Sequence, residues 1–230
     1  DEAEVRGQDS MSYDGVVGRG EAAPIDRYRE TAGSALEFVE RNGHLVGDDP
    51  FALEAIGSRL AEIPGERAAK AALDAGLHDL QGKLLDAPVN RLLGLPREGP
   101  PTSWTVWLGD PDDMARRAER AAADFRRLKL KLGGGDGLDV ERVRAVRGVT
   151  DRPLQVDVNE WWSLDEALDE LEQLAEVGVE YCEQPLRAGD AGGQELRARS
   201  PIPIYVDEDC HTLADVEVCS EIAHGVNIKL

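Results

Sequence analysis

Short apolar runs alternate with stretches of helical periodicity through the second half of the chain. The runs are rich in β-branched and aliphatic residues, and most of them end at a charged residue. Strands alternating with helices of this length are typical of parallel βαβ units. The predicted strands span 102–108, 127–132, 154–158, 179–183, 204–206 and 226–230. The predicted helices between them span 112–125, 138–149, 163–177, 193–199 and 212–223.

The first hundred residues have a different pattern. Glu4-Val5-Arg6 and Val16-Val17-Gly18 flank Tyr13-Asp14-Gly15, in which Asp-Gly is a hairpin turn signal. Helical periodicity follows over 31–42, 50–62 and 65–84, and a proline-rich segment from Leu95 to Pro101 indicates a rigid linker. We therefore predict a mixed α+β domain over 1–100 and a domain of βα repeats over 101–230.

The regular repeat favours a β/α barrel over a doubly wound sheet. A doubly wound nucleotide-binding sheet carries a glycine-rich phosphate loop after its first strand. Gly133-Gly134-Gly135 lacks the GxGxxG spacing and follows the second strand instead. A barrel needs about eight strands to close, whereas this sequence contains six. We expect either that the sequence is a fragment or that further βα units come from elsewhere.

Composition excludes several classes of function. The net charge of −20 argues against nucleic acid, because phosphate contacts need surplus lysine and arginine. No apolar run approaches the roughly 20 residues that span a bilayer, and Asp1 to Ser10 does not resemble a signal peptide. The three cysteines form no CxxC motif. These features predict a cytoplasmic protein with reduced thiols that binds neither membrane nor nucleic acid.

Five ionisable residues recur at nearly constant spacing: Lys131, Asp157, Glu183, Asp207 and Lys229. The steps are 26 (157−131), 26 (183−157), 24 (207−183) and 22 (229−207) residues. Each residue lies at or next to the carboxyl end of a predicted strand. Because these ends converge on one mouth of a parallel barrel, we expect the five side chains to share one site.

Three of these residues are carboxylates on adjacent strands: Asp157, Glu183 and Asp207. Oxygen ligands of this kind suit Mg²⁺, and the pattern offers no histidine or cysteine set for zinc. Single acidic residues at strand ends often cap the next helix, but three at matched positions favour a metal site. Among Asp207, Glu208 and Asp209 we prefer Asp207, because it directly follows the apolar strand 204–206.

Lysines flank the carboxylates. In Leu128-Lys129-Leu130-Lys131-Leu132, period-two alternation places both lysines on one strand face and the leucines on the other. Leucines directed at the outer helices leave the lysines inside the barrel, and the same reasoning applies to Lys229. Two amine bases on opposite sides of one carbon could remove a proton α to a carboxylate and return it to the opposite face.

At these residues the chain resembles the enolase superfamily, in its muconate-lactonising-enzyme subgroup. The motifs that carry the resemblance follow in order and spacing: Lys129-x-Lys131, Asp157-x-Asn159, Glu183-Gln184-Pro185, Asp207-Glu208 and Asn227-Ile228-Lys229, with Val17 to Ala22 similar to a segment of the family's capping domain. Lys131-Leu132-Gly133-Gly134 and the strand Thr102-Ser103-Trp104-Thr105 look most like dipeptide epimerases of the L-Ala-D/L-Glu type.

The resemblance implies an α+β capping domain followed by a (β/α)7β TIM-like barrel, truncated here after the sixth barrel strand. It implies Mg²⁺ on Asp157, Glu183 and Asp207, with Lys131 and Lys229 as the acid/base pair that works through a metal-stabilised enediolate. Lys129 and Thr105 would contact the substrate, a dipeptide or a related carboxylate. Enolase relatives often form homo-oligomers, so self-association is also an expectation.

The chain departs from the family pattern at its ends. It begins inside the capping domain, without the family's first strand and specificity loop, and it ends before strands seven and eight, where an Asp-x-Asp for the dipeptide amino group is expected. Cycloisomerase, N-acylamino-acid racemase and o-succinylbenzoate synthase activities use the same ligands and lysines and stay open as alternatives. So does a catalytically silent barrel.

Overall fold

A computed structural model describes residues 7–229, which divide into two compact units. The first reaches Gly99, and the second spans Pro100–Lys229. Among the helices that the structure describes, none combines the length and the apolar character needed to cross a membrane. Each unit has its own hydrophobic core.

The first unit opens with an antiparallel hairpin of β1 (Gly7–Tyr13) and β2 (Val16–Ala22). Asp14 and Gly15 form its turn with φ angles of 52° and 78°, the left-handed values that this kind of two-residue turn requires. The predicted hairpin is therefore present, with its turn at Asp14-Gly15. The run Glu4–Arg6, which we had assigned to its first strand, lies outside the described residues.

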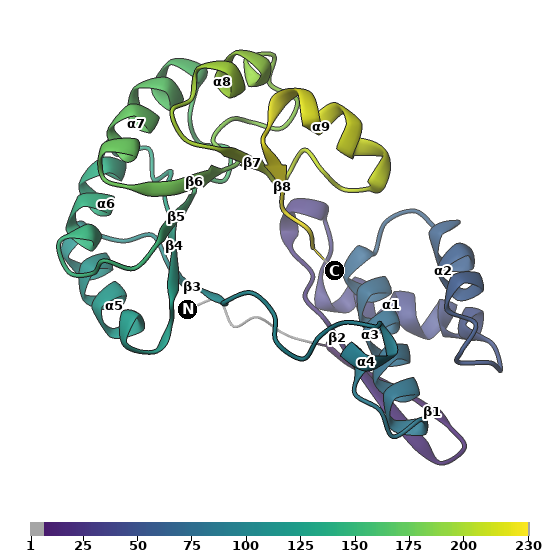
Figure 1. Ribbon diagram of the computed structural model, residues 1–230. Coiled ribbons are helices and arrows are strands. Elements are labelled where there is room, and N and C mark those ends of the chain that lie inside the picture. The colour runs from purple at the N-terminus through teal and green to yellow at the C-terminus, as the bar shows by residue number, and fades with distance from the viewer. Residues whose placement is uncertain (1–6, 230) are drawn as a thin grey trace. The chain divides into compact units, whose positions relative to one another are not determined.

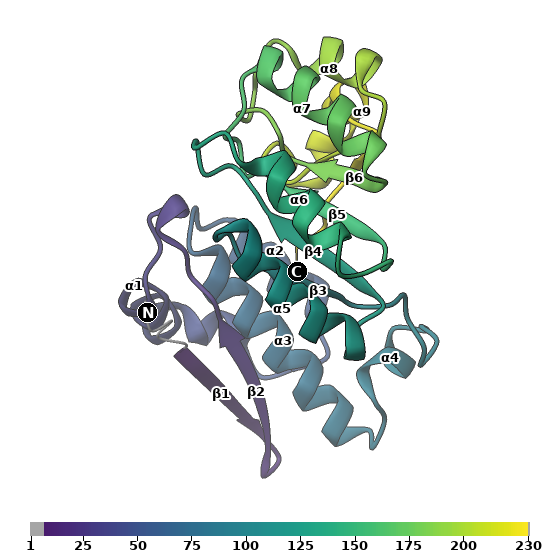
Figure 2. The ribbon, with the colours of Figure 1, turned by 90° about the vertical axis from the view of Figure 1, so that its left-hand side faces the viewer.

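Helices cover one face of this hairpin. The alanine-rich α3 (Arg67–Leu84) buries Ala69, Ala72, Leu73, Leu77 and Leu80 and lies alongside β2, as Figure 2 shows. The alternating positions Gly18, Gly20 and Ala22 of β2 are buried, whereas the residues between them are exposed. The other elements are η1 (Asp26–Tyr28), α1 (Ala32–Asn42), η2 (Gly43–Val46), α2 (Leu53–Ala61) and α4 (Val89–Leu92), of which η1, η2 and α4 were not predicted.

A parallel sheet organises the second unit. Within the described residues it has six strands in sequential order: β3 (Ser103–Val106), β4 (Arg127–Lys131), β5 (Leu154–Asp157), β6 (Val179–Glu183), β7 (Ile204–Val206) and β8 (Gly225–Val226). Figure 1 shows these strands in a curved row with helices along its outer side. This order has no reversal of direction, so the doubly wound alternative is wrong.

The outer helices of this unit begin close to the predicted positions. They are α5 (Pro111–Asp124), α6 (Asp139–Arg147), α7 (Leu164–Glu176), α8 (Gly193–Arg199), η3 (Leu213–Asp215) and α9 (Val216–Ile222). Ser163 caps α7 by accepting a hydrogen bond from the backbone of Glu166, whose side chain reaches back to Ser163. Thr212 and Asp215 form a similar box.

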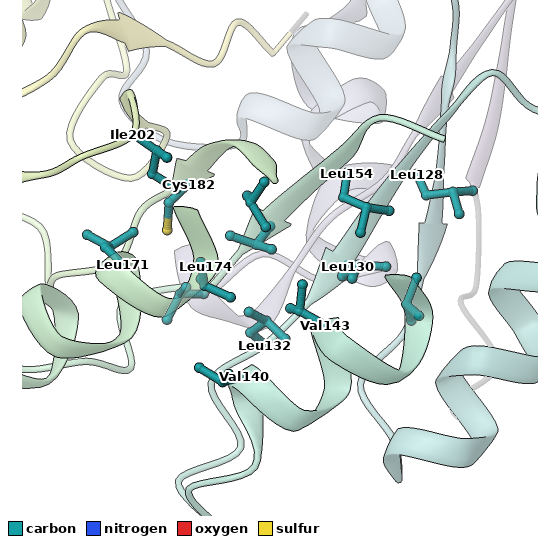
Figure 3. Close-up of a cluster of buried hydrophobic side chains, with 14 of the residues drawn as sticks. Leu128, Leu130, Leu132, Val140, Val143, Leu154, Leu171, Leu174, Cys182 and Ile202 are labelled. Carbon is teal, nitrogen blue, oxygen red and sulfur yellow. The ribbon is translucent and has the colours of Figure 1, made fainter. Parts of the chain in front are cut away.

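Leucines of the sheet fill the core of the second unit. Leu128 and Leu130 of β4 are fully buried and belong to the same cluster as Val140 and Val143 of α6, shown in Figure 3. The intervening Lys129 and Lys131 are half-buried. The predicted division of β4 into a leucine face and a lysine face is therefore confirmed, and the lysines lie on the face away from the helices.

Two strands are shorter than predicted. β3 covers only 103–106 of the predicted 102–108. β8 pairs Gly225 and Val226 with Tyr205 and Val206, and one further hydrogen bond joins Asn227 to Val206. The prediction of a strand over 226–230 is wrong for the described residues 227–229, because β7 ends at Val206 and leaves Ile228 and Lys229 without a residue to pair with. Leu230 lies outside the described residues.

Candidate active site

Strand register aligns the first half of the site. Lys131 lies opposite Asp157, and Asp157 lies opposite Glu183, at the carboxyl ends of β4, β5 and β6. One level below, Thr105 of β3 lies opposite Lys129 of β4. Parallel strands bring residues of equal register together on one face. The register therefore gathers five predicted site residues on neighbouring strands: Thr105, Lys129, Lys131, Asp157 and Glu183.

The two lysines of β4 share one carboxylate. The ammonium nitrogens of Lys129 and Lys131 lie 3.0 and 2.7 Å from Asp157 Oδ2. Lys129 also donates to Glu183 Oε2 at 3.0 Å, and Lys131 donates to Asn159 Oδ1 at 2.7 Å. Asp157 and Glu183 are buried, so both charges are balanced at close range by ammonium groups.

Asparagine side chains hold the carboxylate cluster from two directions. Asn227 donates to Glu183 Oε1 at 2.8 Å, so both oxygens of Glu183 have a donor. Asn159 accepts from Lys131 and donates to Glu208 Oε1 at 3.2 Å. The backbone of Asn159 has a φ of 49°, a left-handed value that asparagine adopts more readily than most non-glycine residues.

Asp207 and Lys229 form the second half of the site. Asp207 follows β7 and is buried, and its Oδ2 accepts from Lys229 Nζ at 2.5 Å. Lys229 lies beyond the end of β8 with 59% of its side chain exposed. The prediction that strand geometry directs Lys229 inward is thus wrong in its cause, because Lys229 lies in no strand, yet its ammonium still reaches Asp207.

Gln184 fixes the segment that carries Asp207. Its side-chain oxygen accepts hydrogen bonds from the backbone nitrogens of Asp207 and Glu208 at 2.8 and 3.0 Å. Its nitrogen donates to Leu186 O at 2.9 Å and to Asp209 Oδ2 at 2.6 Å. Because Asp209 is engaged there, it is the least available of the three acidic residues 207–209 for a metal.

The pKa values of Glu183 and Lys129 are both shifted by burial and by neighbouring charges. Burial raises the pKa of the Glu183 carboxyl, the charges of Asp157 and Asp207 act in the same direction, and Lys129 offsets these effects only in part. Burial by itself lowers the pKa of the Lys129 ammonium, but Asp157 and Glu183 outweigh it and raise that pKa above its usual value. Glu183 and Lys129 therefore shift each other's pKa, as expected for a closely packed charged site.

The donor set fits a hard divalent cation. Asp157, Glu183 and Asp207 offer oxygen ligands only, from three consecutive strands, which is the ligand class that Mg²⁺ prefers. As the side chains stand, no group of three His, Cys, Asp or Glu residues within residues 7–229 is arranged to hold a metal ion. Ammonium groups contact the same carboxylates, with Lys129 bridging Asp157 and Glu183.

Sequence reasoning missed three residues of the site: Asn159, Gln184 and Asn227. All three lie in motifs that we had quoted, but their neutral side chains carry no signal of charge or spacing. Their position next to Asp157, Glu183 and Lys229 was the available signal, since residues flanking strand-end ligands often orient them.

Two family matches cover most of the chain. Residues 10–94 match the mandelate racemase / muconate lactonizing enzyme N-terminal domain, and residues 113–225 match the enolase C-terminal domain-like family. The first match falls in the first structural unit, and the second falls in the second unit.

Curated relatives of the chain include dipeptide epimerases. The chain is 37% identical over 227 residues to an L-Ala-D/L-Glu epimerase of Bacteroides thetaiotaomicron. The aligned region covers 97% of this chain and 59% of the relative. It is 33% identical over 226 residues to a hydrophobic dipeptide epimerase of Enterococcus faecalis, covering 94% of this chain and 64% of the relative. The chain thus spans about three fifths of the length of these relatives.

Solved structures of dipeptide epimerases also resemble this chain. A dipeptide epimerase from Enterococcus faecalis complexed with Mg and L-Leu-L-Tyr superposes with a TM-score of 0.87 at 30% identity, covering 97% of this chain and 66% of that one. A dipeptide epimerase from Cytophaga hutchinsonii complexed with Mg and D-Ala-L-Val gives 0.83 at 26% identity, covering 91% and 60%. The chain belongs to the enolase superfamily, in the mandelate racemase / muconate lactonizing enzyme family.

Proposed function

We propose that the protein is a Mg²⁺-dependent epimerase that inverts the α-carbon of a residue in a small dipeptide. The observation that carries the proposal is the contact of Lys131 and Lys229 with different carboxylates of one set, Asp157 and Asp207. The dipeptide epimerases among its relatives support the substrate class. The family also supports a (β/α)7β barrel and a capping role for the first unit.

The carboxylates are the proposed metal ligands. Asp157, Glu183 and Asp207 would hold Mg²⁺, which supplies positive charge beside the substrate carboxylate and stabilises the negative charge that develops as the α-proton leaves. Loading the site requires Lys129 and Lys131 to release carboxylate oxygens that they contact in this structure. Two relatives with Mg in their solved structures support this assignment.

Lys131 and Lys229 are the proposed acid and base. One neutral amine removes the α-proton from one face of the substrate carbon, and the other ammonium returns a proton to the opposite face. Asn159 fixes the Lys131 ammonium through a 2.7 Å hydrogen bond, which restricts the direction in which that lysine can approach a substrate.

Lys129 and Thr105 are the proposed substrate contacts. They share one register level below Lys131 and lie on the lysine face of the sheet. Lys129 can pair with a substrate carboxylate in the way that it now pairs with Glu183. Three free cysteines suit a reducing compartment, and we propose a cytoplasmic location and a homo-oligomeric state by analogy with the family.

Proton NMR in D₂O tests the reaction directly. The protein is incubated with Mg²⁺ and a pool of L-Ala-L-Xaa dipeptides, and the α-proton signals are followed. We expect one residue to lose its α-proton signal while a new diastereomer appears. A folded protein that binds Mg²⁺ but exchanges no α-proton would contradict the dipeptide assignment.

Lysine variants separate the two acid/base roles. Lys131→Ala and Lys229→Ala should each abolish epimerisation, because one face of the carbon loses its proton donor. Each variant should still exchange the α-proton of the one stereoisomer that faces the remaining lysine. Lys83→Ala, which removes an exposed lysine paired with Asp79 in the first unit, is the matched control and should react normally.

Cycloisomerisation is the second candidate. A muconate lactonizing enzyme structure from a mycobacterium superposes with a TM-score of 0.89 at 28% identity. Turnover of a muconate without α-proton exchange in dipeptides would favour that activity over epimerisation.

A further inference from the structure

Cys210 and Cys219 come from different segments but belong to one packed cluster. Cys210 follows the acidic residues 207–209 after β7, and Cys219 lies in α9. Cys219 is 2% exposed and packs with Val206 and Ala223. Cys210 is half-buried and packs against the same cluster, and its presence contributes to the raised pKa of the Cys219 thiol.

Backbone contacts hold both sulfurs near this position. Cys219 Sγ donates to Asp209 O at 3.5 Å, and Cys210 Sγ lies 4.0 Å from Thr212 O. A disulfide forms only where two sulfurs can meet without large backbone movement. Cys219 Sγ lies against the carbonyl of the peptide bond that links Asp209 to Cys210, and Cys210 packs against the cluster that contains Cys219, so a small side-chain rotation could join the two sulfurs.

We propose that Cys210 and Cys219 form a reversible disulfide when the protein meets a small-molecule disulfide such as glutathione disulfide. The half-buried Cys210 reacts first: its thiolate attacks one sulfur of the glutathione disulfide and releases one glutathione thiolate. Cys219 then loses its proton and attacks the Cys210 sulfur, which releases the second glutathione. Two protein thiols are oxidised, one glutathione disulfide is reduced, and the two protons pass to the two glutathione thiolates.

The second step sets the pH dependence. Burial, followed by the neighbouring Cys210, raises the pKa of the Cys219 thiol to about 11, and the charges of Asp209 and Asp215 act in the same direction. Because the thiolate is the nucleophile, the rate of ring closure should rise roughly tenfold per pH unit between pH 7 and pH 9.

The disulfide would tether two segments around the candidate site. Cys210 is three residues after Asp207, and its backbone nitrogen donates to Asp207 O at 3.1 Å. The disulfide would therefore join the segment that Gln184 holds to helix α9. This is a modification site independent of the proposed epimerase activity.

Mass spectrometry after incubation with glutathione disulfide tests the proposal. We expect the protein to lose the mass of two hydrogen atoms and two of its three titratable thiols. Proteolysis without reductant should then yield one peptide pair linked through Cys210 and Cys219. Cys182 is fully buried with a pKa far above its usual value, so it should stay reduced and report that the protein remains folded.

Two variants distinguish the steps. Cys219→Ser should stop at a stable mixed disulfide of Cys210 with glutathione, because no second thiol displaces it. Cys210→Ser should show no thiol loss over the same period. The proposal is overturned if the unmodified protein also stops at the mixed disulfide, if the linkage joins two protein molecules, or if Cys182 reacts as fast as Cys210.

Discussion

Gln184 is an uncharged residue on which the geometry of the candidate site depends. Its buried amide oxygen holds the backbone nitrogens of Asp207 and Glu208, and its nitrogen binds Leu186 O and the Asp209 carboxylate. Its own backbone has a φ of 41°. A glutamine is required here because the site needs one acceptor and one donor on a planar side chain of this length.

Gln184→Glu should destabilise the protein strongly. The substitution keeps the shape but sets a carboxylate oxygen against two acceptors, Leu186 O and Asp209 Oδ2, in a buried position. We expect the free energy of unfolding to fall by about 3 kcal/mol at pH 7, measured by urea denaturation. The loss should shrink as pH falls, because the new carboxyl has a raised pKa and becomes a donor when protonated.

Gln194→Glu is the matched control for this variant. Gln194 also donates to a carboxylate, Glu221 Oε2 at 3.0 Å, but it is exposed on α8. Solvent screens the repulsion between the two charges there, so the change should stay within about 0.5 kcal/mol. Equal losses in the two variants would show that Gln184 does not depend on its buried contacts.

Asp136 should titrate at unusually low pH. Hydrogen bonds from Arg142 lower the pKa of this exposed carboxyl to about 2, from an ordinary value of 3.8. A lowered folded-state pKa adds stability that is fully present above about pH 4 and is lost as pH falls toward 2. Carboxyl-carbon NMR of the protein should give this value.

Arg142→Gln should return the pKa of Asp136 to the ordinary aspartate range, because it removes the cationic donor. Glu166 offers a control, since Ser163 rather than arginine lowers its pKa. A pKa of Asp136 that stays low in the variant would contradict the assigned cause.

Close contact between β2 and α3 restricts side-chain size in the first unit. A Cβ added to Gly20 would lie 1.8 Å from the backbone oxygen of Ala72 in α3. Since backbone cannot move aside as a side chain can, Gly20→Ala should lower the free energy of unfolding by about 3 kcal/mol or more. Chemical denaturation measures the loss.

Gly57→Ala, in helix α2, serves as the counterpart. Gly57 is exposed in α2 and has nothing within 4 Å of an added Cβ. Alanine favours helix over glycine by about 0.8–1 kcal/mol, so this variant should be more stable than the unmodified protein. Destabilisation of both variants to the same degree would mean that close packing is not what excludes alanine at position 20.

Strand and helix positions in the second unit could be predicted because their signals are local. The leucine and lysine alternation of β4 needs only period-two geometry, and the boxes at Ser163 and Thr212 need only four consecutive residues. The end of β8 could not be predicted in this way. It depends on where the neighbouring β7 stops, which the residues 226–230 do not encode.

The candidate site was predictable in its charges but not in its neutral residues. Regular spacing identified Asp157, Glu183 and Asp207, and register then aligned Asp157 with Glu183. The contacts of Asn159, Gln184 and Asn227 join segments that lie 23 to 49 residues apart. Such contacts follow from tertiary structure, which a local pattern does not contain.

Acidic residues outnumber basic residues over the whole molecule. The chain carries 46 acidic and 26 basic residues, and at the candidate site three buried carboxylates lie among three lysines. Any salt weakens the repulsion between exposed carboxylates on the surface, because mobile ions screen exposed charges. A specific site should instead distinguish Mg²⁺ from Na⁺ at equal ionic strength.

Mg²⁺ should therefore raise the unfolding temperature more than NaCl of matched ionic strength. A ligand that binds only the folded state adds about 2.7 kcal/mol of stability at a hundredfold excess over its dissociation constant. Asp157→Asn and Glu183→Gln should each lose the Mg²⁺-specific part, because each removes a charged oxygen ligand. Asp165→Asn, at an exposed position of α7, should keep it. A shift that NaCl reproduces fully, or that survives in Asp157→Asn, would assign the effect to screening and leave the three carboxylates without a metal role.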